Sequence, residues 1–233
     1  MQPRATLAAV ALMLAGPAAA DVVRADLAAP TGRYDHAVLG DALEWGALNL
    51  TLADGRRLVV TLPDTRVFED VAARLVDADG DGTREVLVVE TDLARGAALT
   101  LYGAGGRLAA TPPTDRRHRW LAPVGVADMD GDGRPEILWI DRPHRTRELV
   151  VGHRQGGRIV EIARLPGLTN HRIGEDRIRG GLRDCGAGAE AVLAAPGWDA
   201  ALAVRLEGRQ LAARPLGPIA GPAGLDAALA CPR

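Results

Sequence analysis

Two short stretches of the chain place carboxylates at the first, third, fifth and ninth positions of a nine-residue window. They comprise Asp77, Asp79, Asp81 and Glu85 in one window, and Asp128, Asp130, Asp132 and Glu136 in the other. Carboxylates this close raise each other's pKa and destabilise a loop unless a cation lies among them. Gly82 and Gly133 stand at position six, where glycine allows the sharp turn that folds a loop around a centre. Hard oxygen ligands in this number suit Ca²⁺.

The residue at position seven, Thr83 or Arg134, can add a backbone carbonyl oxygen to each set. An EF-hand would need a bidentate glutamate at position twelve and a helix on each side. Position twelve is Val88 or Trp139, and an apolar run of the β type follows each loop. The sequence therefore predicts two strand–calcium loop–strand units in which the glutamate at position nine closes the shell. The alternative is a pair of solvated acidic turns that bind no ion.

A period of 51 residues runs through the chain. Gly-Arg dipeptides begin at Gly55, Gly106, Gly157 and Gly208, and an apolar segment lies on each side of every dipeptide. Two strand-like runs joined by a tight turn that contains glycine are typical of a β-hairpin. The acidic loops obey the same spacing, because Asp128 follows Asp77 by 51 residues. We therefore expect four copies of one structural unit.

Each unit is expected to contain four strands. The units lie at about 22–66, 69–116, 119–168 and 177–216, with a closing tail at 217–233. The second strand of the middle units, EVLVVE or EILWID, is apolar without alternation, which predicts burial on both faces. Four-stranded units that stack through such strands are β-propeller blades. We predict an all-β, β-propeller-like array of four four-stranded repeats, which could close into a small four-bladed propeller.

The segments DADGDGTREVLVV and DMDGDGRPEILWI resemble the FG-GAP or VCBS repeat family. Repeats of that family form the blades of the integrin α-chain propeller and occur in many secreted bacterial proteins. The resemblance implies calcium sites that use the eight carboxylates above as ligands, completed by the carbonyls of Thr83 and Arg134. Because sites of this kind contribute little free energy at extracellular calcium, we expect a mainly structural role for the ions. The Phe-Gly and Gly-Ala-Pro signatures that name the family are absent, and four repeats are fewer than the seven blades usual for integrins.

The two outer units have lost most of these acidic residues. Asp35 and Glu190 hold the acidic position in the first and fourth units. Cys185 aligns with Asp132 of the third unit, and Cys231 lies in the tail. We expect a disulfide between the two cysteines that pins the degenerate fourth loop in place of a metal ion. Two buried thiols are the alternative.

Residues 1–20 have the features of a secretory signal peptide: a single arginine, an apolar run and a small-residue cleavage site after Ala20. The apolar run is short for a membrane span, and no other segment is apolar enough. We therefore predict an exported protein, periplasmic or secreted, with residues 21–233 as one mature domain and no transmembrane segment. All 28 basic residues are arginine, which favours a GC-rich bacterial genome. A net charge of −2 gives no general attraction to nucleic acid.

No signature of a zinc protease, a nucleophilic serine or a phosphate-binding loop occurs. We therefore predict a non-catalytic binding or adhesion scaffold whose partner is an unknown protein or glycan on a loop face. The alternatives are a hydrolase or lyase built on the propeller, and a purely structural envelope component. Two basic segments, residues 115–120 and 141–148, are expected to be solvated loops between strands; the alternative is an anion-binding rim, since arginine side chains suit carboxylate, sulfate or phosphate. If His118, His144 and the neighbouring arginines meet in one cleft, they favour the enzyme.

Overall fold

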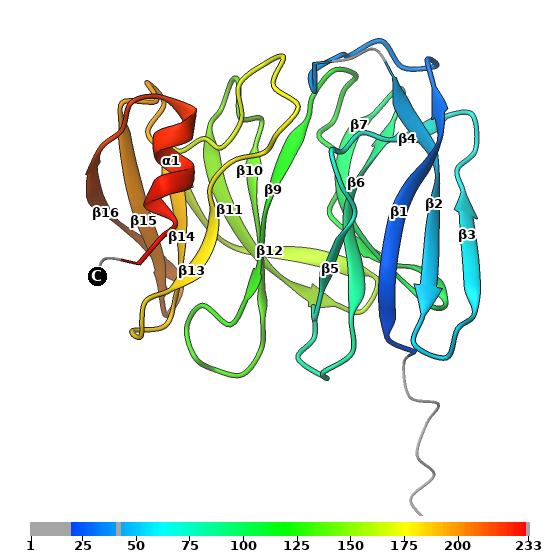
Figure 1. Ribbon diagram of the computed structural model, residues 1–233, viewed down its shortest axis with the longest axis horizontal. Helices are drawn as coiled ribbons and strands as arrows, with labels where there is room; N and C mark the ends of the chain where they lie inside the picture. Colours follow the sequence, from blue (N-terminus) through cyan, green and yellow to red (C-terminus); the bar gives the residue numbers. More distant parts are fainter. Residues whose placement is uncertain (1–19, 41–42, 232–233) are drawn as a thin grey trace, which may run out of the picture.

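The structure is a computed structural model that describes residues 20–40 and 43–231. In this part of the chain sixteen strands are followed by one short helix (Figure 1). Twelve of these strands form one curled sheet, and the last four form a second sheet. The predicted all-β class is confirmed.

The third unit is the four-stranded antiparallel meander that the sequence predicts. Its strands are β9 (Leu121–Ala127), β10 (Glu136–Asp141), β11 (Glu148–Gln155) and β12 (Arg158–Pro166). Every residue of β10 is buried, because the continuous apolar run EILWID packs on both faces. The second acidic loop joins the end of β9 to the start of β10, so two adjacent paired strands fix its position.

The second and fourth units repeat this arrangement of antiparallel neighbours. The second contains β5 (Arg74–Val76), β6 (Glu85–Asp92), β7 (Gly96–Gly103) and β8 (Gly106–Ala110). The fourth contains β13 (Gly181–Asp184), β14 (Ala189–Ala194), β15 (Ala200–Glu207) and β16 (Gln210–Pro218). The first acidic loop therefore joins β5 to β6, in the same relation to its strands as the second loop.

The first unit differs from its prediction of four strands. It contains three full strands: β1 (Val22–Thr31), β2 (Glu44–Leu52) and β3 (Arg57–Thr61). β1 pairs with β2, so it takes the place that the alignment gives to residues 31–40. Asp35 consequently lies in a loop and not at the start of a buried strand. The reason is that β1 is the edge strand of the sheet and does not need a continuous apolar run.

The hairpins predicted at the four Gly-Arg dipeptides are all present, as β2–β3, β7–β8, β11–β12 and β15–β16. A short strand, β4 (Arg66–Phe68), pairs with both β2 and β6 and joins the first unit to the second. Apolar clusters span the units: Leu99 and Trp139 belong to one cluster, and Leu138 and Leu193 belong to another. The units are thus held together mainly by side-chain burial, at about 1.5–3 kcal/mol for each large apolar side chain.

The tail contains the helix, α1 (Pro222–Ala228), which lies against the fourth unit (Figure 1). Leu225 of this helix is fully buried there. No helix in the described residues is both long and apolar enough to cross a membrane. The predicted signal peptide, residues 1–20, lies outside the described residues except for Ala20.

Candidate metal centre

The first acidic loop is folded by its own carboxylates. Asp77 accepts hydrogen bonds from the backbone amides of Gly80 and Gly82, at 2.7 and 3.0 Å. Gly82 has a φ of +85°, which favours glycine at this position. Glu85, the first residue of β6, accepts a 2.9 Å hydrogen bond from another loop amide. As a result, ligand oxygens of Asp77, Asp79 and Glu85 all lie within 4.8 Å of one another.

The second acidic loop has the same geometry. Asp128 accepts hydrogen bonds from the amides of Gly131 and Gly133, at 2.8 and 2.9 Å. Glu136, the first residue of β10, accepts a 2.7 Å hydrogen bond from a loop amide. Oxygens of Asp128, Asp130 and Glu136 again lie within 4.8 Å of one another. The chain therefore gathers the same three oxygen donors twice.

The aspartates at position five bind the loop backbone and are not members of these groups of three. Asp81 accepts hydrogen bonds from the amide and the hydroxyl of Thr83, at 2.7 and 2.6 Å. Asp132 accepts a 2.7 Å hydrogen bond from the amide of Arg134. In both cases the same oxygen, Oδ1, is used. A ligand role for these aspartates, and for the carbonyls of Thr83 and Arg134, stays a prediction.

The two glutamates are the buried members of the sets, with Glu85 3% and Glu136 0% exposed. Burial raises the pKa of both carboxyls, and the neighbouring aspartates raise it further. Oε1 of Glu136 accepts no hydrogen bond, although Nδ1 of His153 lies 3.3 Å away. A buried carboxylate oxygen without a hydrogen bond is costly. A cation held by this group of donors would supply the missing interaction.

The two loops lie against each other. A Cβ atom added at Gly80 would lie 3.2 Å from the carbonyl oxygen of Gly133. Arg154 of β11 reaches across from the third unit and donates a 2.6 Å hydrogen bond to Asp79. In the described part of the chain, no arginine side chain contacts the carboxylates of the second loop. The first site therefore carries a guanidinium that the second lacks.

The fourth unit keeps the strand register of these sites but has a shorter loop. Arg183 of β13 and Glu190 of β14 face each other, so Asp184 stands at position one. Asp184 accepts hydrogen bonds from two loop amides, at 2.7 and 3.1 Å. Cys185 therefore occupies position two, and its predicted alignment with Asp132 is wrong.

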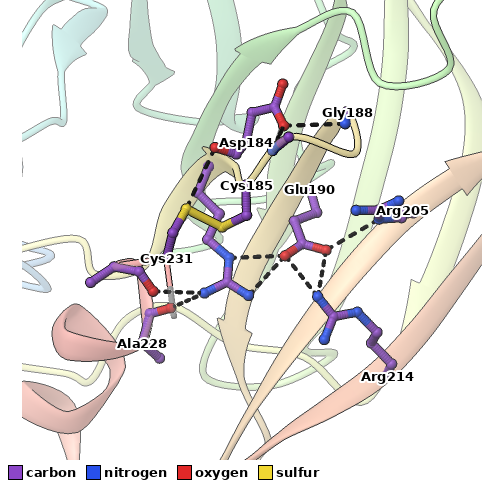
Figure 2. Close-up of a disulfide and its surroundings, with 11 residues drawn as sticks. Asp184, Cys185, Gly188, Glu190, Arg205, Arg214, Ala228 and Cys231 are labelled. Carbon is purple, nitrogen blue, oxygen red and sulfur yellow. Dashed lines mark hydrogen bonds and ion pairs between the residues drawn. A yellow bond between two sulfur atoms is a disulfide. The ribbon is translucent and has the colours of Figure 1, made fainter. Parts of the chain in front are cut away.

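The predicted disulfide between Cys185 and Cys231 is confirmed (Figure 2). It joins the shortened loop to the segment that follows α1, across 46 residues of sequence. Arg183 of β13 adds a second link to the tail, because its guanidinium donates a 2.5 Å hydrogen bond to the carbonyl of Ala228 at the end of α1. The disulfide thus pins the loop, as expected.

Positive charge in the fourth unit comes from arginine. Glu190 is 1% exposed and is surrounded by guanidiniums (Figure 2). Those of Arg183, Arg205 and Arg214 lie 2.8, 3.2 and 2.9 Å from its carboxylate oxygens. Although burial opposes ionisation, the three arginines hold the pKa of Glu190 below its usual value. Glu190 is therefore a charged group whose partners the chain itself provides.

These three arginines and Arg154 were not predicted from the sequence. The period of 51 residues contains a signal for two of them: Arg205 follows Arg154 by one period, and Arg214 follows Ala163. Arg183 could be found only from the strand register, since the shortened loop breaks the spacing on its N-terminal side. The clearest signal is Arg214, which replaces an alanine of the third unit while Glu190 retains the acidic position.

These features define an all-β repeat protein with two matching acidic loops. Residues 77–139 match a family model described as an FG-GAP-like repeat. The match begins at the first aspartate of the first loop and ends within β10, so it contains both acidic loops. Comparisons with curated proteins and with solved structures gave no significant match.

Proposed function

We propose that the protein is an exported calcium-binding repeat protein that acts as a non-catalytic binding scaffold. Its four units stack as the blades of a small β-propeller. Ca²⁺ orders the acidic loops of the second and third units, with the eight carboxylates and the carbonyls of Thr83 and Arg134 as ligands. The FG-GAP-like match over both loops supports this proposal.

One contrast carries the calcium proposal. Glu136 is the first residue of β10, and Glu190 is the second residue of β14, the equivalent strand of the fourth unit. Both side chains are buried. Glu190 has three guanidiniums around it, whereas Glu136 has two aspartates and His153 beside it, and its Oε1 accepts no hydrogen bond. The fourth unit thus provides positive charge beside its buried glutamate, whereas the third unit provides further carboxylates. The third unit is therefore suited to binding a cation from solution. Donors that are all oxygen favour Ca²⁺ over Zn²⁺.

The ions have a structural role in this proposal. At millimolar extracellular calcium and a Kd of roughly 0.1–1 mM, each site adds about 0.4–1.4 kcal/mol to the free energy of unfolding. Such a contribution orders a loop without making the whole fold depend on metal. The site around Asp128 is the tighter of the two, because the guanidinium of Arg154 competes with Ca²⁺ for Asp79 in the other.

Export is supported by the disulfide, since disulfides persist in oxidising compartments such as the periplasm and the extracellular space. The scaffold function is supported by the repeat architecture, which presents loops at both ends of the strands (Figure 1). The partner in this proposal is a protein or a glycan. A hydrolase or lyase is the second candidate, favoured by one observation: His118, His144 and nearby arginines line one pocket.

The calcium proposal is tested by thermal unfolding of the protein in Ca²⁺ and in chelator. Two sites together should raise the melting temperature by about 2–10 °C, at about 2–4 °C per kcal/mol for a chain of this size. Asp128→Ala should lose part of this rise. Asp184→Ala removes the equivalent aspartate of the fourth unit, so it is the matched control and should keep the full calcium response. An unchanged melting temperature of the parent protein in Ca²⁺ refutes the sites.

A further inference from the structure

A second group of chemically active side chains gathers at the other ends of β9 and β10. The acidic loop lies at the start of β10, and a pocket of about 260 Å³ lies beyond its end, a strand length of roughly 20 Å away. Six basic side chains line it: His36, His118, His144, Arg119, Arg142 and Arg145. The two basic segments predicted to be separate solvated loops therefore share one cleft.

The rim of this pocket is positively charged. Asp35 is its only lining carboxylate in the described chain, and Arg117 and His118 already bind it, at 2.5 and 2.8 Å. Arg119 and Arg145 also line the pocket, and neither has an ion-pair partner among the described residues. Two guanidiniums without a counter-charge at a concave site are suited to holding an oxyanion in a forked hydrogen bond.

A chain of hydrogen bonds fixes the tautomer of His144. The carbonyl oxygen of Glu175 can only accept, so Nε2 of His171, 2.9 Å away, carries a hydrogen. Burial lowers the pKa of His171, and it lowers the pKa of His144 to about 4, so both rings are neutral at pH 7. Neutral His171 accepts at Nδ1 from Nε2 of His144, at 2.9 Å. Nδ1 of His144 is then a fixed hydrogen-bond acceptor.

His36 is oriented in a comparable way by a buried carboxylate. Its Nδ1 contacts Glu69, which is 0% exposed and also accepts a 2.6 Å hydrogen bond from the hydroxyl of Thr91. Because Nδ1 is engaged, Nε2 is the nitrogen of His36 that remains for a ligand in the pocket. Two of the three lining histidines are thus held by partners behind them.

Two residues that line this pocket have a strained backbone. His118 and Arg142 have φ values of 57° and 47°, in the left-handed region that side-chain-bearing residues rarely adopt. Ala37, in the loop beside His36, has a φ of 49°. Such conformations are unfavourable for residues with side chains, and strain of this kind is common at ligand sites.

We propose that this pocket binds a small hydroxylated oxyanion, the size of a sugar acid or a sugar phosphate. Arg119 and Arg145 hold the anionic group, and Nδ1 of His144 accepts a hydrogen bond from a hydroxyl of the ligand. The volume lies just below the range of about 300–1,000 Å³ usual for drug-sized ligands, which fits a single sugar ring. The site does not involve the acidic loops, so it stands independently of the calcium proposal.

Titration calorimetry of the full chain tests this site with four probes: galacturonate, glucose 6-phosphate, glucose and acetate. We expect saturable binding of galacturonate, of glucose 6-phosphate, or of both, and the stronger of the two identifies the anionic group. Glucose lacks the charge and acetate lacks the hydroxyls, so each should bind at least about 10-fold more weakly. Binding should persist in chelator.

Variants separate the two halves of the proposed site. Replacing Arg119 and Arg145 together by glutamine should weaken binding of the charged sugar by about 10-fold or more, since the charge-assisted hydrogen bonds to the anionic group are lost. His144→Gln should reduce the preference for galacturonate over acetate. Arg209→Gln, at an exposed turn of the fourth unit, is the control and should bind as the parent does. No saturable binding of either charged sugar, or binding that the arginine variant leaves unchanged, overturns the proposal.

Discussion

At the scale of one residue, Glu190 is a buried carboxylate that is stabilised by positive charges from the chain itself. Its carboxylate has three guanidinium partners, so its replacement by glutamine leaves three arginines without their common counter-charge. Glu190→Gln should lower the free energy of unfolding by about 2–4 kcal/mol, because breaking a buried ion pair from one side is strongly destabilising. Urea unfolding should show the same loss in Ca²⁺ and in chelator.

Glu136→Gln is the matched comparison at the equivalent acid of the third unit. In chelator this change should alter the free energy of unfolding little, because it removes a buried charge whose Oε1 accepts no hydrogen bond. In Ca²⁺ the variant should lose the stabilisation that the parent gains. A loss in chelator as large as that of Glu190→Gln would show that Glu136 has a protein partner equal to the arginines.

His144 should give the protein a stability loss in mild acid. The folded pKa of this histidine is about 4, because the ring is buried, whereas the unfolded value is about 6.5. Between these values the unfolded chain takes up a proton that the folded chain does not, so stability is full above pH 6.5 and falls toward pH 4. The loss is on the order of 2–3 kcal/mol. Urea unfolding between pH 7 and pH 5 should show this slope, and His144→Gln should flatten it.

At the scale of residues, the sequence predicts side chains that lie close together along the chain better than it predicts side chains that meet across neighbouring strands. The positions of Asp77 and Asp128, and the pairing of the two cysteines, follow from residues close in sequence or from their small number. The arginines around Glu190 come from three different strands, so their convergence depends on register. The pocket of His36, His118 and His144 depends on the fold in the same way, because His36 and His144 are 108 residues apart in the sequence.

At the scale of elements, the tail and the fourth unit depend on the disulfide. The bond between Cys185 and Cys231 closes a segment of 46 residues, which in the chain-entropy account stabilises by about 4 kcal/mol. Replacing both cysteines by serine should lower the free energy of unfolding by an amount of this order. The change should also expose α1 to limited proteolysis. Unaltered protease resistance of α1 would mean that the burial of Leu225 alone holds the helix.

The elements themselves were predictable where the sequence pattern is strong. Glycine turns between apolar runs predicted all four hairpins, and the unbroken apolar run of β10 predicted its complete burial. The first unit was mispredicted because β1 is an edge strand. Many of its residues are exposed, including the charged Arg24 and Asp26, so it lacks the continuous apolar run of a buried strand. Alignment to a fully buried strand therefore favoured the wrong segment, residues 31–40.

For the whole molecule, the period predicts four copies but not how they are joined. The first three units share one sheet through short connections, namely β4 between the first two and a single parallel pair, Arg158 with Ala110, between the next two. The fourth unit forms a sheet of its own, and in the described part of the chain one isolated bridge, between Thr169 and Ala194, joins it to the segment that connects β12 to β13. A loop of the first unit closes back on the chain ahead of the fourth, where the amide of Gly174 donates to the carbonyl of Val38. These joints depend on a few residues that carry no periodic signal.

This arrangement predicts that the fourth unit opens before the rest. Among the described residues its strands share no ladder with the larger sheet, and they are joined to the rest by side-chain packing and the isolated bridge, since the disulfide lies within the fourth unit and its tail. In native-state hydrogen exchange, amides of β14 and β15 should exchange through an opening of lower free energy than amides of β6 and β10, because subglobal units open separately when few interactions link them. Ca²⁺ should raise protection around residues 77–85 and 128–136 and leave β14 and β15 unchanged. A single opening free energy for all these strands would show that the four units unfold as one.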